Sequence, residues 1–151
     1  RAAADATPAA EAQAGAAAEA RPAAEARALG DTFVASADPE RTRRAVTNLV
    51  ENAVKHGGRS AVAIKLRLRA LPGTVELAVS DDGEGVGEED LPRLFEPFFR
   101  GDRARGRGGS GLGLAIVRRL METQGGSARA ARGAAGGLEV TLGFSKADAD
   151  G

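Results

Sequence analysis

The 151-residue sequence contains no cysteine. This absence excludes disulfide bonds, cysteine-built zinc sites and thiol chemistry, and it leaves the redox compartment open. Lysine plus arginine number 21, and so do aspartate plus glutamate, so there is no excess of either sign. The balance argues against a protein dedicated to nucleic acid or to a membrane surface. No apolar run is long enough to cross a bilayer, and no secretory signal is present.

Lysine and phenylalanine are scarce. Only three of the 21 basic residues are lysines, so Lys55 stands out, and three of the five phenylalanines fall within residues 95–99. The chain begins at Arg1 and its single methionine is Met121, so we expect it to be a fragment of a larger protein.

The length suffices for one compact domain with a core. Residues 1–20 are alanine-rich with little apolar bulk, which predicts a linker or flexible tail. We expect the domain to occupy residues 21–146 and a C-terminal tail to occupy 147–151. A short helix is predicted for residues 23–29 and a short strand for 32–36.

A capped amphipathic helix is predicted for residues 39–56. Asp38 can cap it, Pro39 suits its first position, and Gly57-Gly58 ends it. Its apolar residues recur with helical spacing and form one stripe, made of Val46, Leu49, Val50, Ala53 and Val54.

The opposite side of this helix carries an unusual polar stripe of Asn48, Asn52, Lys55 and His56. Asparagine is a poor helix former that competes for backbone hydrogen bonds, and a solvated face would normally carry Glu, Lys or Arg. Two carboxamides in register with Lys and His therefore indicate a polar ligand. A lone histidine in the last turn is more often a capping or packing residue, so His56 alone indicates little.

Alternating apolar residues predict an antiparallel hairpin of strands 62–69 and 74–80, and residues 81–111 are irregular and punctuated by glycine. A second amphipathic helix, marked by Leu112, Ala115, Ile116 and Leu120, should end at Gly125-Gly126. Two closing strands are expected near 127–132 and 138–144.

The first candidate site is the acidic loop Asp-Asp-Gly-Glu-Gly-Val from residue 81, directly after a predicted strand. A carboxylate at Asp81 can accept a hydrogen bond from the amino group of adenine and disfavours guanine, which has an acceptor there. The alternatives are a plain acidic turn, which is the commoner meaning of such a run, and a calcium loop. The acidic spacing does not fit an EF-hand.

The second candidate is the glycine-rich run from residue 108, which opens the second helix. Its glycines expose backbone N–H groups at a helix N-terminus, which suits a triphosphate. A flexible linker is the alternative, and the run is neither a Walker loop nor a dinucleotide fingerprint. The preceding arginines (Arg100, Arg103, Arg105 and Arg107) are either a solvated run or a glycine-hinged lid that reaches phosphates.

Four motifs occur in order: Asn-Leu-Val-Glu-Asn-Ala-Val-Lys-His from residue 48, Asp-Asp-Gly-Glu-Gly from 81, Leu-Phe-Glu-Pro-Phe-Phe-Arg from 94 and Gly-Ser-Gly-Leu-Gly-Leu-Ala-Ile-Val from 109. Together they resemble the N, G1, F and G2 boxes of the catalytic, ATP-binding domain of bacterial sensor histidine kinases, over about residues 31–145. The resemblance implies a Bergerat-type α/β two-layer sandwich, with helices on one face of a mixed, mostly antiparallel sheet.

The resemblance also implies the residues of a site for ATP and Mg²⁺. Asn52 would hold magnesium that bridges the phosphates, Asn48 would assist, and Glu51 is near enough to act as a base. Asp81 would read adenine. The other residues implied to contact ATP or to shape its pocket are Lys55, His56, Gly83, Gly85, Val86, Phe95, Arg103, Arg105, Gly109, Ser110, Gly111, Leu112 and Gly113.

Two departures from the family pattern concern the adenine pocket and the phosphoacceptor. Leu138 and Glu139 stand where the family often has threonines. The family's phosphoacceptor histidine is missing, and His56 is not a candidate for that role, since it belongs to the implied nucleotide site.

The implied function is transfer of the γ-phosphoryl group of ATP to a histidine on a separate dimerisation domain, in a two-component system with a response regulator downstream. We expect a cytoplasmic domain of a membrane-anchored parent, without nucleic acid or direct membrane contact of its own. One alternative is a hydrolysing ATPase of the gyrase and heat-shock chaperone branch, or a related anti-sigma factor serine kinase. These carry glutamate at the position of Asn48, and a carboxamide cannot act as a base. A non-catalytic docking module is disfavoured, because all four boxes are intact.

Overall fold

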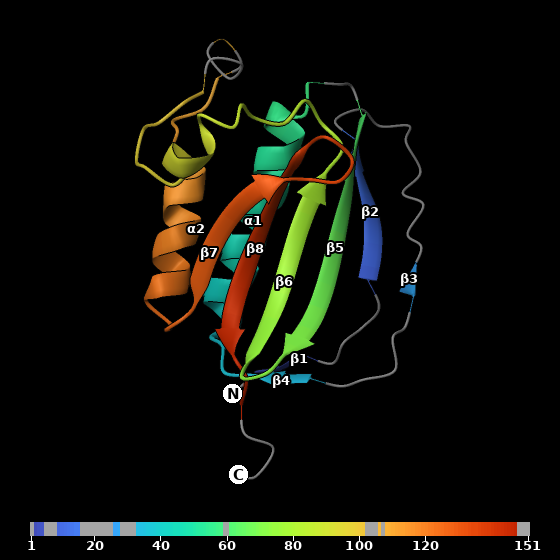
Figure 1. Ribbon diagram of the computed structural model, residues 1–151, viewed down its shortest axis with the longest axis vertical. Helices are drawn as coiled ribbons and strands as arrows, with labels where there is room; N and C mark the ends of the chain where they lie inside the picture. Colours follow the sequence, from blue (N-terminus) through green and yellow to red (C-terminus); the bar gives the residue numbers. More distant parts are fainter. Residues whose placement is uncertain are drawn as a thin grey trace.

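The computed structural model describes residues 2–4, 9–15, 26–27, 33–58, 61–101, 106 and 108–147, with side chains from residue 35 onward. One layer is a sheet, and two helices lie behind it in Figure 1, so the predicted two-layer α/β architecture is confirmed. The elements are β1 (Ala2–Ala4), β2 (Ala9–Gly15), β3 (Ala26–Arg27), β4 (Phe33–Ala35), α1 (Pro39–His56), β5 (Ala61–Leu71), β6 (Thr74–Asp81), the 3-10 helix η1 (Leu91–Arg93), α2 (Gly113–Glu122), β7 (Ser127–Arg132) and β8 (Leu138–Ser145).

The main sheet has the strand order β3-β2-β5-β6-β8-β7, and β1 pairs separately with β4. The predicted hairpin is confirmed, since β5 and β6 pair in antiparallel fashion from Leu71 opposite Thr74, next to the turn, to Ile64 opposite Asp81. All pairings among the described strands are antiparallel, where the resemblance implied a mixed sheet. Antiparallel neighbours can be joined by short turns, which is why β5–β6 and β7–β8 need no crossover.

The N-terminal segment contributes strands. β1 and β2 lie in residues 1–20, for which the sequence predicts a linker, and β2 extends the sheet by pairing with the edge of β5. An edge strand offers unpaired N–H and C=O groups, so backbone pairing there requires no bulky side chains. The helix predicted for residues 23–29 is wrong at Ala26–Arg27, which pair with β2; the rest of that range, like residues 148–151 of the predicted tail, lies outside the described residues.

Helix α1 has the predicted bounds and cap. The Asp38 side chain accepts a hydrogen bond from the Arg41 N–H at 3.0 Å, and Pro39 occupies the first turn. The side chains that it buries against the sheet are Ala45, Leu49 and Ala53. The predicted valines 46, 50 and 54 flank this line and pack against the core while remaining half-buried.

Helix α2 buries a different face from the one that we predicted. Leu114, Val117 and Met121 are buried, whereas Ile116 and Leu120 of the predicted stripe are only half-buried. The segment is apolar around most of its circumference, so its sequence defines two overlapping stripes, and packing against α1 and the sheet decides between them. Neither α1 nor α2 combines the length and the apolar character that crossing a bilayer requires, within the part of the chain that the structure describes.

The two helices are joined at one end. The Asp38 N–H donates to Gln124 Oε1 at 2.8 Å, and the Arg41 guanidinium donates to the Thr123 carbonyl at 3.1 Å. These bonds link the start of α1 to the residues that follow α2. The other ends of both helices lie together at the top of Figure 1, beside the end of β6.

Candidate functional site

A cavity of about 290 Å³ lies where α1 ends and α2 begins. Its volume is close to the lower end of the range for small-molecule sites. Residues from all four sequence motifs line it, although they are far apart in the chain. The predicted site residues that line it are Asn48, Glu51, Asn52, Lys55, His56, Asp81, Gly85, Val86, Gly109, Ser110, Gly111, Leu112 and Gly113.

Two predicted residues lie behind the cavity wall, and two lie outside the described residues. Gly83 packs against the end of α1, since a Cβ on it would lie 2.7 Å from the Gly57 Cα. Phe95 is buried, with the Arg118 guanidinium 5.8 Å from its ring centre. Arg103 and Arg105 belong to the part of the chain that the structure leaves undescribed. Gly83 and Phe95 therefore support the cavity and do not line it.

The polar stripe of α1 forms one wall. Asn48 donates its Nδ2 hydrogen to the Arg44 carbonyl one turn earlier, at 2.9 Å. This bond fixes the orientation of the carboxamide and leaves Oδ1 as the group that can meet a ligand. A Cβ placed on Gly113 would lie 3.9 Å from this oxygen, so the start of α2 faces the amide wall closely.

The glycine-rich run forms the facing wall at the start of α2. Among the described residues no side chain caps α2, so its first N–H groups can receive an anion, and the helix dipole favours one there. Gly111 has a φ of 70°, and a Cβ on it would lie 2.8 Å from the carbonyl carbon of Phe98. Its carbonyl stays close to the aromatic motif, because Phe98 donates its N–H to the Gly111 carbonyl at 3.0 Å. Only glycine fits this position.

Asp81 occupies the base of the cavity at the end of β6. Its Oδ1 accepts the Gly83 N–H at 2.8 Å and, across the sheet, the Leu138 N–H at 3.4 Å. Both bonds reach the same oxygen, so Oδ2 remains to accept a bond from a ligand. Burial raises the pKa of this carboxyl above its usual value; the two backbone N–H groups oppose the shift, and the charge of Asp82 adds to it.

The turn between β7 and β8 fixes the position of Asp81. A Cβ on Gly137 would overlap the Asp81 carbonyl oxygen and Oδ1. A residue with any side chain at position 137 would therefore displace the carboxylate. Leu138, which departs from the family pattern, contributes its backbone N–H to Asp81 and also lines the cavity.

Of the apolar lining, the sequence assigned only Val86 and Leu112 to the nucleotide site. Leu94, Phe99, Ile116 and Leu138 line the cavity together with the polar residues. Leu94 and Phe99 belong to the motif around the phenylalanines, which was a usable signal. The departure from the family pattern at Leu138 pointed to this edge of the adenine pocket, and the pairing of β8 with β6 brings Leu138 next to Asp81. Arg100 of the candidate lid, Gly108 of the glycine-rich run and Leu114 of the fourth motif also line the cavity. The lining residues that no prediction included are Gly87, Asp90 and Gly101.

The donor set suits a magnesium ion that arrives with phosphate. Asn48 and Asn52 supply hard amide oxygens, which Mg²⁺ accepts, and Mg²⁺ normally takes most of its ligands from phosphates and water. No group of three or more His, Asp or Glu side chains that could hold a metal unaided occurs among the described residues. The residues present therefore fit a metal held jointly with a ligand.

Sequence comparisons place the chain among ATPases. Residues 37–148 match the family described as "Histidine kinase-, DNA gyrase B-, and HSP90-like ATPase". Sensor histidine kinase component HK1 of Mycobacterium tuberculosis is 44% identical over 113 residues, which cover 74% of this chain and 64% of that protein. Sensor-like histidine kinase SenX3 of Mycobacterium tuberculosis is 49% identical over 88 residues, covering 56% of this chain and 21% of that protein. The chain thus spans less than two thirds of these relatives.

Solved structures agree with this assignment. The mycobacterial sensor histidine kinase MprB superposes with a TM-score of 0.68 at 31% identity, covering 76% of this chain and 78% of that one. The ATP binding domain of PrrB from Mycobacterium tuberculosis superposes with a TM-score of 0.64 at 30% identity, covering 80% and 78%. The matched residues 37–148 contain the whole cavity described above. The chain therefore belongs to the family of histidine kinase-, DNA gyrase B- and HSP90-like ATPases, on the branch of the sensor histidine kinases.

Proposed function

We propose that this chain binds Mg-ATP and presents its γ-phosphoryl group to a histidine on a separate dimerisation domain of the same kinase. The observation that carries the proposal is a single cavity between the amides of α1 and the uncapped start of α2, with Asp81 at its base. One end of this cavity suits an amino-bearing purine and the other suits phosphates. The relationship to sensor histidine kinases supports the direction of transfer.

The proposed residue roles follow from this arrangement. Asp81 accepts a hydrogen bond from the adenine amino group through Oδ2, while its Oδ1 stays held by the backbone. The first N–H groups of α2 receive the phosphates. Asn52, assisted by Asn48, holds the magnesium ion, which neutralises phosphate charge when it is bound. The domain contributes positioning and charge neutralisation and forms no covalent intermediate itself.

The remaining predicted residues take supporting roles in the same proposal. Lys55 and His56 line the cavity next to the glycine-rich run, where they can contact phosphate or ribose; a Cβ on Gly109 would lie 4.0 Å from His56 Nε2. Arg103 and Arg105, outside the described residues, remain the proposed lid arginines. We further propose a response regulator as the downstream partner, and a cytoplasmic position within a membrane-anchored parent.

The first test is nucleotide binding by calorimetry. The chain should bind ATP more tightly with Mg²⁺ than with EDTA, and Asn52→Ala should remove this difference while leaving metal-free binding nearly unchanged. The matched control is Thr47→Ala, on the same helix, whose exposed hydroxyl donates to the Arg43 carbonyl at 2.9 Å. Unchanged magnesium enhancement in Asn52→Ala would contradict the proposed metal role.

The second test is phosphotransfer with γ-³²P-ATP. The chain alone should acquire no stable label, because its only histidine is His56, which lines the cavity. Adding the dimerisation domain of the parent kinase should give an acid-labile label on that domain. Stable phosphohistidine on the chain alone would refute the assignment.

A second candidate function is ATP hydrolysis. Glu51 favours it, because this carboxylate lies on the cavity wall beside Asn52 and can act as a base. Against it, the carboxamide of Asn48 occupies the position where hydrolysing relatives carry glutamate. Fast phosphate release by the chain alone, abolished in Glu51→Gln, would favour hydrolysis over phosphotransfer.

A further inference from the structure

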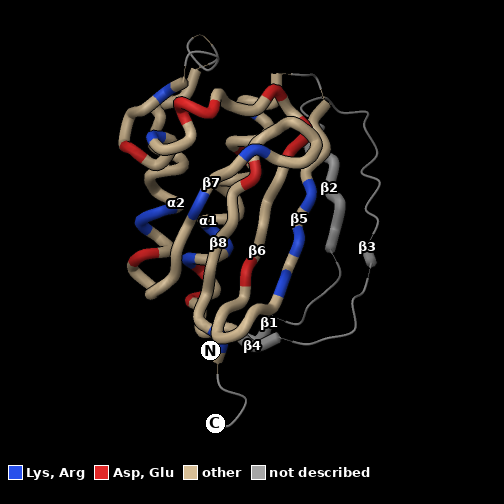
Figure 2. The backbone as a smooth tube through the Cα atoms, viewed as in Figure 1, with Lys and Arg blue, Asp and Glu red and all other residues tan. Residues whose placement is uncertain are grey.

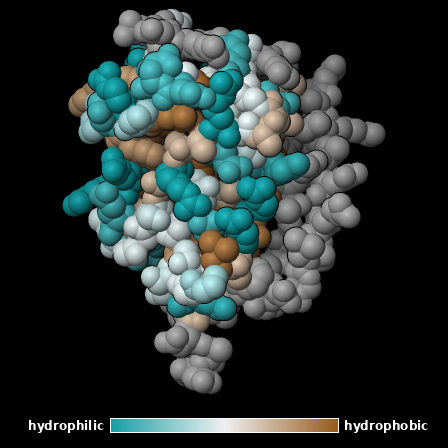
Figure 3. Space-filling model, viewed as in Figure 1, coloured by the Kyte–Doolittle hydropathy of each residue, from teal (hydrophilic) through white to brown (hydrophobic). Residues whose placement is uncertain are grey.

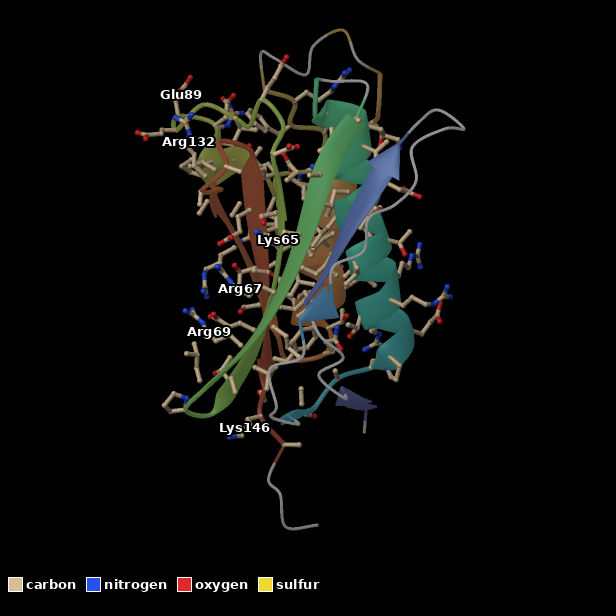
Figure 4. All side chains as sticks on the ribbon, turned by 90° about the vertical axis from the view of Figure 1, so that its right-hand side faces the viewer. Lys65, Arg67, Arg69, Glu89, Arg132 and Lys146 are labelled. Carbon is tan, nitrogen blue, oxygen red and sulfur yellow. The ribbon has the colours of Figure 1, made fainter. Side chains whose placement is uncertain are left out.

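The sheet face opposite α1 and α2 is covered by neither helix (Figure 1). We call this surface the open face and define it by its charged residues: Lys65, Arg67, Arg69, Glu76, Arg129 and Glu139. They come from β5, β6, β8 and β7 and project to one side because their strand positions are in register. Figure 4 shows Lys65, Arg67 and Arg69 pointing away from the helices.

The arginines of the open face are held by carboxylates of other strands in the same sheet. Glu76 accepts hydrogen bonds from Arg69 Nη2 at 2.8 Å and from Arg129 Nη2 at 2.7 Å. Arg67 Nη2 lies 3.4 Å from Glu139 Oε2. The hydrogen bond from Arg69, followed by that from Arg129, lowers the pKa of Glu76. The network crosses four strands and keeps the guanidinium groups at defined positions.

The charges of the open face lie in two levels. The side chain of Glu76 is 8% exposed and that of Glu139 is 24% exposed, whereas Arg67, Arg69 and Arg129 are 57–60% exposed. The carboxylates therefore lie beneath, and a partner would meet the guanidinium groups first. Figures 2 and 3 show the basic residues along β5 and a hydrophilic surface over the middle of this face.

The exposed level offers hydrogen-bond donors. A guanidinium carries five N–H groups, and each of these three arginines contacts a carboxylate of the described residues through Nη2. The other N–H groups can each receive a carboxylate of a partner, often in pairs. The positive surface is local, because the sequence as a whole has zero net charge.

We propose that the open face docks an acidic protein surface, one that presents several Asp or Glu side chains. A lipid surface fits less well, because membrane binding normally adds apolar side chains that insert, and the one large exposed hydrophobic side chain among the described residues is Phe98. Phe98 lies beside Gly111, a residue of the cavity wall, and not on the open face. Planar, preorganised guanidinium groups match carboxylates. This proposal does not depend on the function proposed for the cavity.

The test uses the whole chain and a synthetic peptide of about 12 residues with alternating Glu and Ser. In NMR spectra of the ¹⁵N-labelled chain, the peptide should shift the Nε–Hε signals of Arg67, Arg69 and Arg129 and leave those of Arg43 and Arg118 unchanged. The shifts should shrink at about 0.5 M salt, where charge interactions are screened. A Lys-Ser peptide of the same length should produce none.

The variant pair is Arg67→Gln with Arg129→Gln. This double variant should weaken binding of the acidic peptide about tenfold, as expected for the loss of two charge-assisted contacts at a partly exposed surface. The matched control is Arg43→Gln with Arg44→Gln, which removes the same charge from exposed positions on α1 and should leave affinity unchanged. If the double variant unfolds, Arg67→Gln alone, whose partner Glu139 is less buried than Glu76, should still weaken binding.

Equal weakening by both pairs would overturn the proposal, because net charge alone would then explain binding. Signals that shift only outside the open face would also overturn it. Vesicles of phosphatidylglycerol that bind the chain more tightly than the peptide does, with the same arginines shifted, would replace the protein partner with a membrane.

Discussion

Replacing Asp81 with asparagine should reverse the base preference of the cavity. The two backbone N–H groups from Gly83 and Leu138 both reach Oδ1, so in Asp81→Asn the amide oxygen should remain there. The Nδ2 group would then stand where Oδ2 stands now. A hydrogen-bond donor would then face the base in place of the carboxylate oxygen. This donor opposes the amino group of adenine and suits the acceptor that guanine carries at the equivalent position.

The size of the effect follows from the type of bond. A hydrogen bond to a charged group contributes about 1.5–3 kcal/mol, and losing it should weaken ATP binding by about 10- to 150-fold. The repulsion between the Nδ2 donor of asparagine and the amino donor of adenine adds to this loss. GTP should gain, because its acceptor no longer faces a carboxylate. The ratio of ATP affinity to GTP affinity should therefore fall by more than the ATP affinity itself.

Calorimetry with ATP and GTP, in the presence of Mg²⁺, measures both affinities. A thermal melt checks that the variant is folded. We expect it to be folded, because the backbone N–H groups of Gly83 and Leu138 keep their acceptor at position 81. An Asp81→Asn protein with the ATP preference of the original would refute the assignment of Asp81. Equal loss for both nucleotides would mean that Asp81 supports the cavity and does not read the base.

Protonation of Asp81 should act in the same direction as the asparagine. Because burial raises the pKa of this carboxyl, ATP affinity should begin to fall at a higher pH than an ordinary aspartate would produce. The stability of the folded, ligand-free domain depends on pH in the opposite sense. The stabilising contribution of protonated Asp81 is fully present below the pKa of this group in the unfolded chain, and it is lost as pH rises through the higher pKa in the folded chain. Asp81→Asn should remove both dependences, and a pH-independent affinity of the original chain for ATP would contradict them.

Three further substitutions test other contacts. Gly137→Ala should weaken ATP binding at least about tenfold, because its Cβ would overlap Asp81; unchanged affinity by calorimetry would contradict that close approach. Gly111→Ala should lower the free energy of unfolding by about 1–3 kcal/mol, measured in guanidinium chloride, because φ is 70° and the Cβ would meet Phe98; a neutral change would disprove the steric argument. Glu76→Gln should destabilise by about 1–3 kcal/mol at neutral pH. Since the pKa of Glu76 is lowered, that difference should vanish as pH falls through the folded pKa, and a difference independent of pH would exclude a charge effect.

The sequence predicted the elements whose signals are local. The bounds of α1 agree to the residue, since Asp38 and Pro39 specify its start and Gly57-Gly58 its end. Strand alternation and glycine turns located β5–β8 within a few residues. The order of the four motifs predicted that α1, the end of β6 and the start of α2 would meet at one site, and the cavity brings these segments together.

Features that depend on pairing between distant strands were not predictable. The bond between Arg129 and Glu76 joins residues 53 positions apart and requires the register of β6, β8 and β7. The approach of Gly137 to Asp81 depends on the same register. The buried face of α2 was ambiguous because its apolar residues nearly surround it, and β2 forms through backbone pairing that side-chain periodicity does not report.

The link between Asp38 and Gln124 determines how the cavity can change its width. With one end of α2 tied to α1, an approach of the other end would be a rotation about the tie, in which displacement grows along the helix. Ten residues of helix measure about 15 Å, so a rotation of about 10° would carry Gly113 through about 2.5 Å while Gln124 hardly moves. A small angular adjustment of α2 would thus change the spacing of the two walls.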